Sequence, residues 1–191
     1  MHKADLRKLM FAQRHLLTLD EVAERSMKIA DHFFDSIPLD GIKSVHTFLP
    51  IHKNQEVNTG LIVDRLRLNY PEIKIVVPVT HFGTNQLSHY LITPETELKT
   101  NNWGITEPVN ATPVQPSEID LVIVPLLAFD LKGHRVGYGK GYYDHFLSQC
   151  RPEIQKIGVS LFTAIAAIAD VHEKDMALDT VLTPEKIYTF S

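Results

Sequence analysis

The chain has 191 residues, of which 44% are hydrophobic and 22% charged, and its formal net charge at pH 7 is −4. This length allows one substantial core, and the charge argues against a nucleic-acid-binding surface, which is usually strongly basic. No apolar run approaches a membrane span, the first residues lack a secretory signal, and the single Cys150 excludes an internal disulfide. We therefore expect a cytoplasmic protein with no nucleic-acid or membrane partner.

Two helices and a strand are predicted in the first quarter of the chain. Apolar residues recur with a helical period over residues 3–17. Thr18 and Glu21 have the spacing of a capping box, which would start a second helix that ends near Asp35. A short strand over residues 44–49 is expected next.

The rest of the chain alternates strands and helices. The predicted elements are a helix from Asn58 or Thr59 to Pro71, strands over residues 73–79, 87–92, 120–125, 156–161 and 186–190, and a helix over residues 141–149. Residues 93–117 are rich in proline and polar side chains, so a long irregular connection is expected there. This alternation predicts a single α/β domain over residues 1–191, with a mainly parallel central sheet and helices on both faces.

A glycine-rich loop between a predicted strand and a predicted helix is the most informative segment. Residues 137–141 hold three glycines that alternate with larger residues. Closely spaced glycines let backbone N–H groups turn toward a ligand and form an anion-binding nest at the start of a helix. Arg135 and Lys140 add cationic donors for phosphate oxygens, and Asp144 adds a hard oxygen ligand suited to Mg²⁺. The segment therefore indicates nucleotide chemistry.

The same segment also permits simpler interpretations. It matches neither a P-loop nor the dinucleotide-binding fingerprint. It is also compatible with a turn shaped only by packing, with Tyr142 and Tyr143 as core aromatics. Two cations and an acid within ten residues favour the nucleotide interpretation over that one. None of the ten histidines has the spacing of an HExxH metal motif.

Four further blocks accompany the glycine loop. They are Lys3-Ala4-Asp5-Leu6-Arg7, Glu56-Val57-Asn58-Thr59, Gly104-Ile105-Thr106-Glu107-Pro108 and Asp175-Met176-Ala177-Leu178-Asp179-Thr180-Val181-Leu182. In this order and spacing, the blocks resemble the 5-formyltetrahydrofolate cyclo-ligase family over nearly the whole chain. The resemblance implies that ATP phosphorylates the formyl oxygen of 5-formyltetrahydrofolate, that N10 then closes the ring to 5,10-methenyltetrahydrofolate, and that ADP and phosphate are released. Phosphoryl transfer of this kind depends on positioning and charge neutralisation, so no protein nucleophile is required.

The resemblance also implies roles for individual residues. The ATP-binding residues are Lys3, Arg7, Arg135, Val136, Gly137, Tyr138, Gly139, Lys140, Gly141, Tyr142 and Tyr143. The folate-binding residues are Leu49, Glu56, Tyr138, Gly139, Lys140, Gly141 and Tyr142. Within these sets, Lys140 and Arg135 are the catalytic residues, Lys140 by stabilising the transferring phosphoryl group. Glu56 would accept paired hydrogen bonds from the pterin, and the Mg²⁺ ligands are Asp144 and Asp179.

Several alternatives stay open at this point. Lys3 and Arg7 also suit a solvated helix end, and Asp144 and Asp179 also suit ordinary acidic positions. Trp103, the only tryptophan, either stacks on a ligand or packs within the protein. For the whole chain, we expect a monomeric ligase that uses ATP, Mg²⁺ and 5-formyltetrahydrofolate. The other hypotheses are a paralogue that acts on another formylated substrate and a non-catalytic folate- or nucleotide-binding protein.

Overall fold

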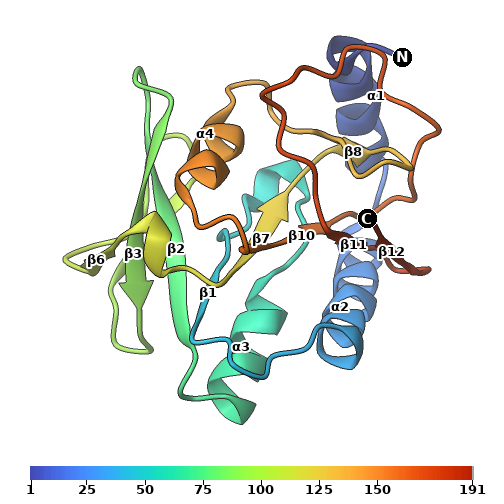
Figure 1. The fold of residues 1–191 in the computed structure, drawn as a ribbon. Coiled ribbons are helices and arrows are strands. Elements are labelled where there is room, and N and C mark those ends of the chain that lie inside the picture. Colours follow the sequence, from blue (N-terminus) through green and yellow to red (C-terminus); the bar gives the residue numbers. More distant parts are fainter. Residues whose placement is uncertain (191) are drawn as a thin grey trace.

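The computed structural model describes residues 1–190 and is built around one eight-stranded sheet (Figure 1). Its strand order is β12-β11-β10-β7-β1-β2-β3-β6. The five parallel strands in the middle are β11 (Thr180–Leu182), β10 (Gln155–Val159), β7 (Leu121–Pro125), β1 (Ser44–His46) and β2 (Lys74–His81). The antiparallel strands at the edges are β12 (Ile187–Thr189), β3 (Gln86–Ile92) and β6 (Thr112–Val114). The predicted α/β fold with a mainly parallel sheet is confirmed.

Helices cover both faces of the sheet, as Figure 1 shows for α4 on one side and for α2 and α3 on the other. These helices span Leu19–Ser36 (α2), Gly60–Asn69 (α3) and Tyr142–Gln149 (α4). Alternate residues of a strand point to opposite faces, so β2 contributes to two cores. Ile75 and Val77 pack in the cluster that contains Phe33 of α2, whereas Val76 packs with Phe146 of α4. Burial on both faces explains the continuous apolar runs of the central strands.

The first helix, α1 (Lys3–His15), packs beside a small hairpin rather than on the main sheet. The hairpin consists of β8 (Ala128–Phe129) and β9 (Arg135–Val136). Leu6 and Met10 of α1 are buried against Val136 and neighbouring apolar residues. This packing places α1 directly beside the glycine-rich loop that follows β9.

Most predicted elements are confirmed within a few residues of their predicted ends. The capping box at the start of α2 is present, because Glu21 N donates to Thr18 Oγ1 (3.1 Å) and Thr18 N donates to Glu21 Oε2 (2.7 Å). The prediction of an irregular connection over residues 93–117 is wrong in part. That segment contains β4 (Leu98–Thr100), β5 (Thr106–Pro108), β6 and the 3-10 turn η2 (Pro116–Glu118).

The physical reason for that error is that proline is tolerated where a strand has a free edge. Pro108 ends β5 of the two-stranded β4–β5 hairpin, and Pro113 lies in β6 at the edge of the main sheet. Three further strands were not predicted because they are very short. Strand β11 has three residues, and β8 and β9 have two each. Within residues 1–190, no helix is long and apolar enough to cross a membrane.

Candidate active site

A cavity of about 540 Å³ lies at the carboxyl ends of β1, β2 and β7. Phe48 and Leu49 line it just beyond β1, Thr80 lines it near the end of β2, and Pro125 lines it at the end of β7. The glycine-rich loop and α1 close the opposite wall. Ligands of open α/β sheets typically bind at this edge, and the volume suits one or two small organic ligands.

The glycine-rich loop presents free backbone amides to the cavity. None of the N–H groups of residues 137–144 donates a hydrogen bond to any residue from 1 to 190. Gly139 (φ +90°) and Gly141 (φ +71°) have left-handed backbone conformations, and a Cβ on Gly139 would lie 3.1 Å from Arg7 Cζ. Gly139 and Gly141 therefore permit the loop conformation, and Gly139 also permits the close approach of the Arg7 side chain. The free N–H groups of the loop are potential donors for an anion.

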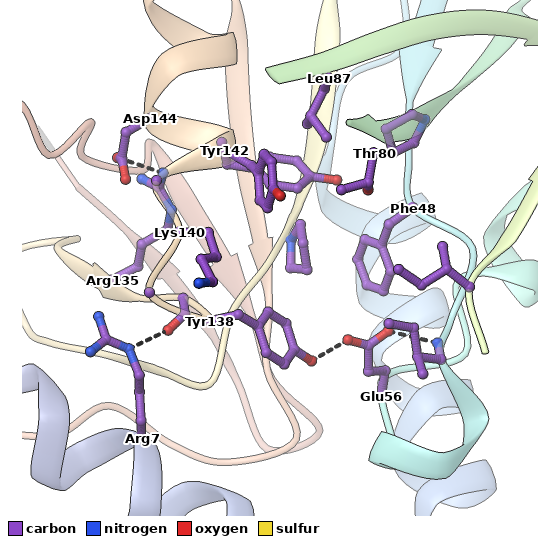
Figure 2. A pocket seen from close by; sticks show the side chains of 18 of the residues that line it. Arg7, Phe48, Glu56, Thr80, Leu87, Arg135, Tyr138, Lys140, Tyr142 and Asp144 are labelled. Carbon is purple, nitrogen blue, oxygen red and sulfur yellow. Dashed lines mark hydrogen bonds and ion pairs between the residues drawn. The ribbon is translucent and has the colours of Figure 1, made fainter. Parts of the chain in front are cut away.

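Four cationic side chains line the cavity beside this loop, and three of them already have partners. Lys3 Nζ lies 2.5 Å from Asp175 Oδ2, and Arg7 Nε donates to the carbonyl oxygen of Gly137 (2.9 Å). Arg135 is buried and donates to Asp144 Oδ1 (2.7 Å) and to the carbonyl oxygen of Met176 (Figure 2).

Lys140 is the exception among these cations. Its side chain lines the cavity and has no hydrogen bond or ion pair with the described part of the chain. In Figure 2 it extends into the space between Arg7 and Tyr142. Its ammonium is therefore available to a ligand without breaking an internal contact.

The two predicted metal ligands, Asp144 and Asp179, lie in different parts of the fold. Asp144 lines the cavity, whereas Asp179 does not. Asp179 lies just before β11, where its carboxylate pairs with Lys156 Nζ (2.9 Å) and accepts from Lys156 N (2.7 Å). Lys156 is next to Val122, near the start of β7, so Asp179 lies toward the end of the sheet opposite the cavity. The expectation that Asp144 and Asp179 share one site does not match this geometry.

The other aspartate that lines the cavity is Asp175, four residues before Asp179. Asp144 Oδ1 accepts hydrogen bonds from Arg135 and from Met176 N (3.0 Å), and Asp175 Oδ2 accepts from Lys3 and from His172 N (2.6 Å). Each carboxylate keeps its other oxygen free of hydrogen bonds from residues 1–190. No group of three or more His, Cys, Asp or Glu side chains suited to a metal occurs among those residues. A cation here would need ligand oxygens or water to complete its shell.

The other end of the cavity is mostly apolar. Side chains from two strands and three connecting segments form its walls: Phe48, Leu49, Ile51, Pro78, Phe82, Leu87 and Ile105. Thr80, Thr106 and Glu56 are the polar residues among them. Figure 2 shows Phe48, Thr80 and Leu87 on the side of the cavity away from Arg7 and Asp144. This end suits a flat organic ring with a few polar groups.

Glu56 is the one carboxylate at the apolar end, and only 6% of it is exposed. Ile51 N donates to its Oε2 (2.7 Å), and the Tyr138 hydroxyl donates to its Oε1 (Figure 2). Burial raises the pKa of the Glu56 carboxyl, while these two hydrogen bonds and the nearby charge of Arg14 act in the opposite direction. A buried carboxylate with remaining lone pairs is a specific acceptor for a ligand with adjacent N–H groups.

The structure brings the other predicted site residues together, with one exception. The residues that line the cavity are Lys3, Arg7, Leu49, Glu56, Arg135, Gly137, Tyr138, Gly139, Lys140, Gly141, Tyr142, Tyr143 and Asp144. Val136 does not, because it lies in β9 with its side chain buried against Leu6 and Met10. Trp103 does not line the cavity either; it is 63% exposed and its ring packs on Phe82, 5.3 Å between centroids.

Comparisons with known proteins agree with this arrangement. The model of the 5-formyltetrahydrofolate cyclo-ligase family matches residues 1–184. The chain is 32% identical over 187 residues to the probable 5-formyltetrahydrofolate cyclo-ligase of Schizosaccharomyces pombe, which covers 84% of this chain and 90% of that protein. Its fold is similar to the 5,10-methenyltetrahydrofolate synthetase of Aquifex aeolicus, with a TM-score of 0.81, 29% identity, and 99% and 93% of the two chains covered. The fold is also similar to the 5,10-methenyltetrahydrofolate synthetase of Mycoplasma pneumoniae, with a TM-score of 0.75 and 26% identity. That comparison covers 96% of this chain and 99% of the other. The chain therefore belongs to the 5-formyltetrahydrofolate cyclo-ligase family of ligases.

Proposed function

We propose that this protein converts 5-formyltetrahydrofolate to 5,10-methenyltetrahydrofolate in a reaction that consumes ATP and requires Mg²⁺. The observation that carries the proposal is the composition of one cavity. One end offers free amides and cations for a triphosphate, and the other offers an apolar slot with a single carboxylate for a pterin. Each end matches one of the two substrates, and both ends open into the same space.

The nucleotide's phosphates would bind to the loop of residues 137–141 and the start of α4. The amides there would donate to phosphate oxygens, and Arg7 and Lys3 of α1 would add positive charge. Lys140, with no internal partner, is proposed to contact the γ-phosphoryl group as it is transferred. Arg135 supports the same charge from its buried position beside Asp144.

Asp144 fits the requirements of a Mg²⁺ ligand, because one carboxylate oxygen stays uncommitted beside the phosphate-binding loop. Mg²⁺ commonly takes one or two carboxylates and fills its shell with phosphate oxygens and water. Asp175 is the second carboxylate in reach of the same space, and we propose it in place of Asp179. The cation would neutralise the triphosphate.

The folate's pterin would lie in the apolar slot with its amino-pyrimidinone edge toward Glu56. A carboxylate accepts two parallel hydrogen bonds from such an edge, which fixes the orientation of the ring. Phe48, Leu87 and Ile105 would contact its faces. Tyr138 and Tyr142 lie between the two ends of the cavity in Figure 2, where the formyl group and the γ-phosphate would meet.

Two steps account for the reaction. The formyl oxygen attacks the γ-phosphorus, the bond to the β-phosphate oxygen breaks, and ADP leaves. N10 then attacks the activated formyl carbon, the carbon–oxygen bond breaks with release of phosphate, and N10 loses its proton to give the methenyl bridge. The protein's part is to align the two substrates and to stabilise the charge on the phosphoryl group, which is where most catalysis of phosphoryl transfer arises.

An absorbance assay for methenyltetrahydrofolate tests the proposal. Purified protein is mixed with 5-formyltetrahydrofolate, and ATP and Mg²⁺ are added or omitted one at a time. Product that needs both, with one ADP formed per methenyl group, is the expected result. Ligand binding without product would favour a non-catalytic binding protein, and product only from a different formylated compound would favour a paralogue.

A further inference from the structure

A buried arginine on α1 contacts the glycine-rich loop from outside the cavity lining. Arg14 is in the last turn of α1 and is 3% exposed. Its Nη1 donates to the Tyr138 hydroxyl (3.0 Å), and its Nη2 donates to the carbonyl oxygen of Leu126 (2.5 Å). Leu126 directly follows β7, so Arg14 connects α1, the sheet and the loop at one point. Nothing in the sequence near Arg14 predicts this role.

The chemistry of the guanidinium fixes the direction of the next hydrogen bond. An arginine side chain can only donate hydrogen bonds, so the Tyr138 oxygen must accept from Arg14. A tyrosine hydroxyl has one hydrogen, and the second polar group within its reach is Glu56 Oε1. Tyr138 therefore donates to Glu56. Arg14 donates to Tyr138 and Tyr138 donates to Glu56, so Glu56 is the acceptor at the end of this chain of hydrogen bonds.

We infer that Arg14 is a positioning residue for substrate recognition, which acts through Tyr138 to hold Glu56 oriented and ionised for the pterin. The inference rests on the proposed function, because it gives Glu56 the folate as its ligand. Arg14 itself does not line the cavity, so it acts on the substrate through Tyr138 and Glu56 and not by direct contact. The residue is thus a specificity determinant rather than a catalytic one.

The charges around Glu56 agree with this role. Burial acts to keep the Glu56 carboxyl protonated and raises its pKa, and Ile51 N, the Tyr138 hydroxyl, Arg14 and His52 oppose that effect. Tyr143 is the remaining titratable group that faces Glu56, and burial raises the pKa of both tyrosines, so they stay neutral. Arg14 is the only one of these groups with a permanent positive charge.

The same helix also fixes the loop one residue earlier. Arg7 and Arg14 are two turns apart on one face of α1, and Arg7 donates to the carbonyl oxygen of Gly137, next to Tyr138. The ring of Tyr138 packs on Phe11, between these arginines in sequence (5.6 Å between centroids). Helix α1 therefore sets both the backbone position and the hydroxyl direction of Tyr138.

Variants of the first two residues of this chain of hydrogen bonds, Arg14 and Tyr138, test the inference. Tyr138→Phe removes the hydroxyl but keeps the ring on Phe11, and Arg14→Met removes the cation. Each should raise the dissociation constant of 5-formyltetrahydrofolate about tenfold, as expected for loss of a hydrogen bond to a charged group, with little change for ATP. In the Tyr138→Phe background, Arg14→Met should add much less than it does alone.

A matched control and a milder variant keep the test independent of folding defects. Arg25 of α2 also donates to a carbonyl oxygen, that of Leu161 (2.9 Å), but does not contact Tyr138. Arg25→Met should leave folate affinity unchanged. Arg14→Lys, which keeps the charge, should recover part of the affinity lost in Arg14→Met. Equal effects of Arg14→Met in the presence and absence of the tyrosine hydroxyl would overturn the inference.

Titration of Glu56 separates this inference from the proposed function. In protein labelled with ¹³C at glutamate carboxyls, the Glu56 signal is assigned by its absence in Glu56→Gln. Its pKa should move upward in Tyr138→Phe and in Arg14→Met, because each variant removes a group that favours the carboxylate. An unchanged pKa in both variants would overturn the inference whether or not the enzyme turns over. A shifted pKa in a protein that forms no methenyl product would instead count against the proposed function.

Discussion

The two ends of the cavity are built in different ways. The end with the cations is formed by one contiguous segment, residues 135–144, against the first turns of α1. The apolar end takes Phe48, Thr80, Leu87 and Ile105 from four separate parts of the chain. The first end depends on free backbone amides in a loop where Gly139 and Gly141 have left-handed backbone conformations, whereas the shape of the second end is set by side chains. A few consecutive residues can thus form an anion site, whereas a slot for an organic ring is formed by residues that are far apart in the sequence.

This difference implies that variants at the two ends should change different kinetic constants. At the cation end, the decisive substitution is Lys140→Met. It should lower kcat about 10²-fold or more and change the KM for folate little, because it removes an ammonium that has no partner among residues 1–190 and is proposed to contact the transferring group. Steady-state assays with each substrate varied measure both constants.

Two control variants make that result specific. Lys132→Met removes an exposed lysine in the β8–β9 turn and should keep wild-type activity. Lys140→Arg retains a charge and should keep more activity than the methionine variant. A Lys140→Met enzyme with wild-type kcat would exclude the proposed phosphoryl contact.

At the apolar end, Glu56→Gln is expected to raise the KM for folate by roughly 10- to 30-fold and to change the KM for ATP much less. The glutamine keeps one acceptor oxygen but replaces the other with an amino group, so the paired hydrogen bonds to the pterin are lost. The same steady-state assay gives both constants. Equal increases for the two substrates would remove Glu56 from the pterin site.

Mg²⁺ dependence distinguishes the acid in the cavity from the acid outside it. Asp144→Asn should raise the Mg²⁺ concentration needed for half-maximal activity about tenfold, because it weakens a carboxylate ligand. Asp179→Asn should instead lower the melting temperature, through loss of its contacts with Lys156, and leave the Mg²⁺ requirement unchanged. The opposite pattern would restore Asp179 as the metal ligand.

Folate affinity should change gradually with pH, because it depends on the ionised form of Glu56. Burial raises the pKa of Glu56, and the protonated carboxyl cannot accept two hydrogen bonds. As the pH is lowered from 8, folate affinity should therefore decline about twofold by the raised pKa and by up to tenfold per pH unit below it. Glu56→Gln should lack this decline. Binding titrations at constant ionic strength measure the effect, and a parallel decline in both proteins would assign it to another group.

The sequence predicted the cation end of the site better than the apolar end. Three glycines, two cations and an acid lie within ten residues, so their chemistry can be predicted from the sequence without knowledge of the fold. Nothing in the sequence distinguishes Pro78 of β2, Leu87 of β3 or Phe48 just beyond β1 until the sheet brings them to one edge. Glu56 was found through the family resemblance and not through any local pattern.

The differences between the predicted and the observed arrangement have equally physical causes. Asp175 and Asp179 are four residues apart in one segment, and only the approach of that segment to β11 decides which carboxylate faces the cavity. Arg14 contacts Tyr138 across 124 residues of sequence, a pairing set by the packing of α1 beside the β8–β9 hairpin. The short strands β5 and β6 contain Pro108 and Pro113, a residue type that usually ends strands, and free strand edges accommodate both prolines.

An isotope experiment decides whether the two ends act together on one bond. 5-Formyltetrahydrofolate labelled with ¹⁸O in the formyl group is converted with unlabelled ATP and Mg²⁺, and the released phosphate is analysed by mass spectrometry. If the cavity holds the formyl oxygen against the γ-phosphorus, each phosphate carries one ¹⁸O atom. Phosphate without the label, formed alongside methenyl product, would contradict direct phosphorylation of the folate.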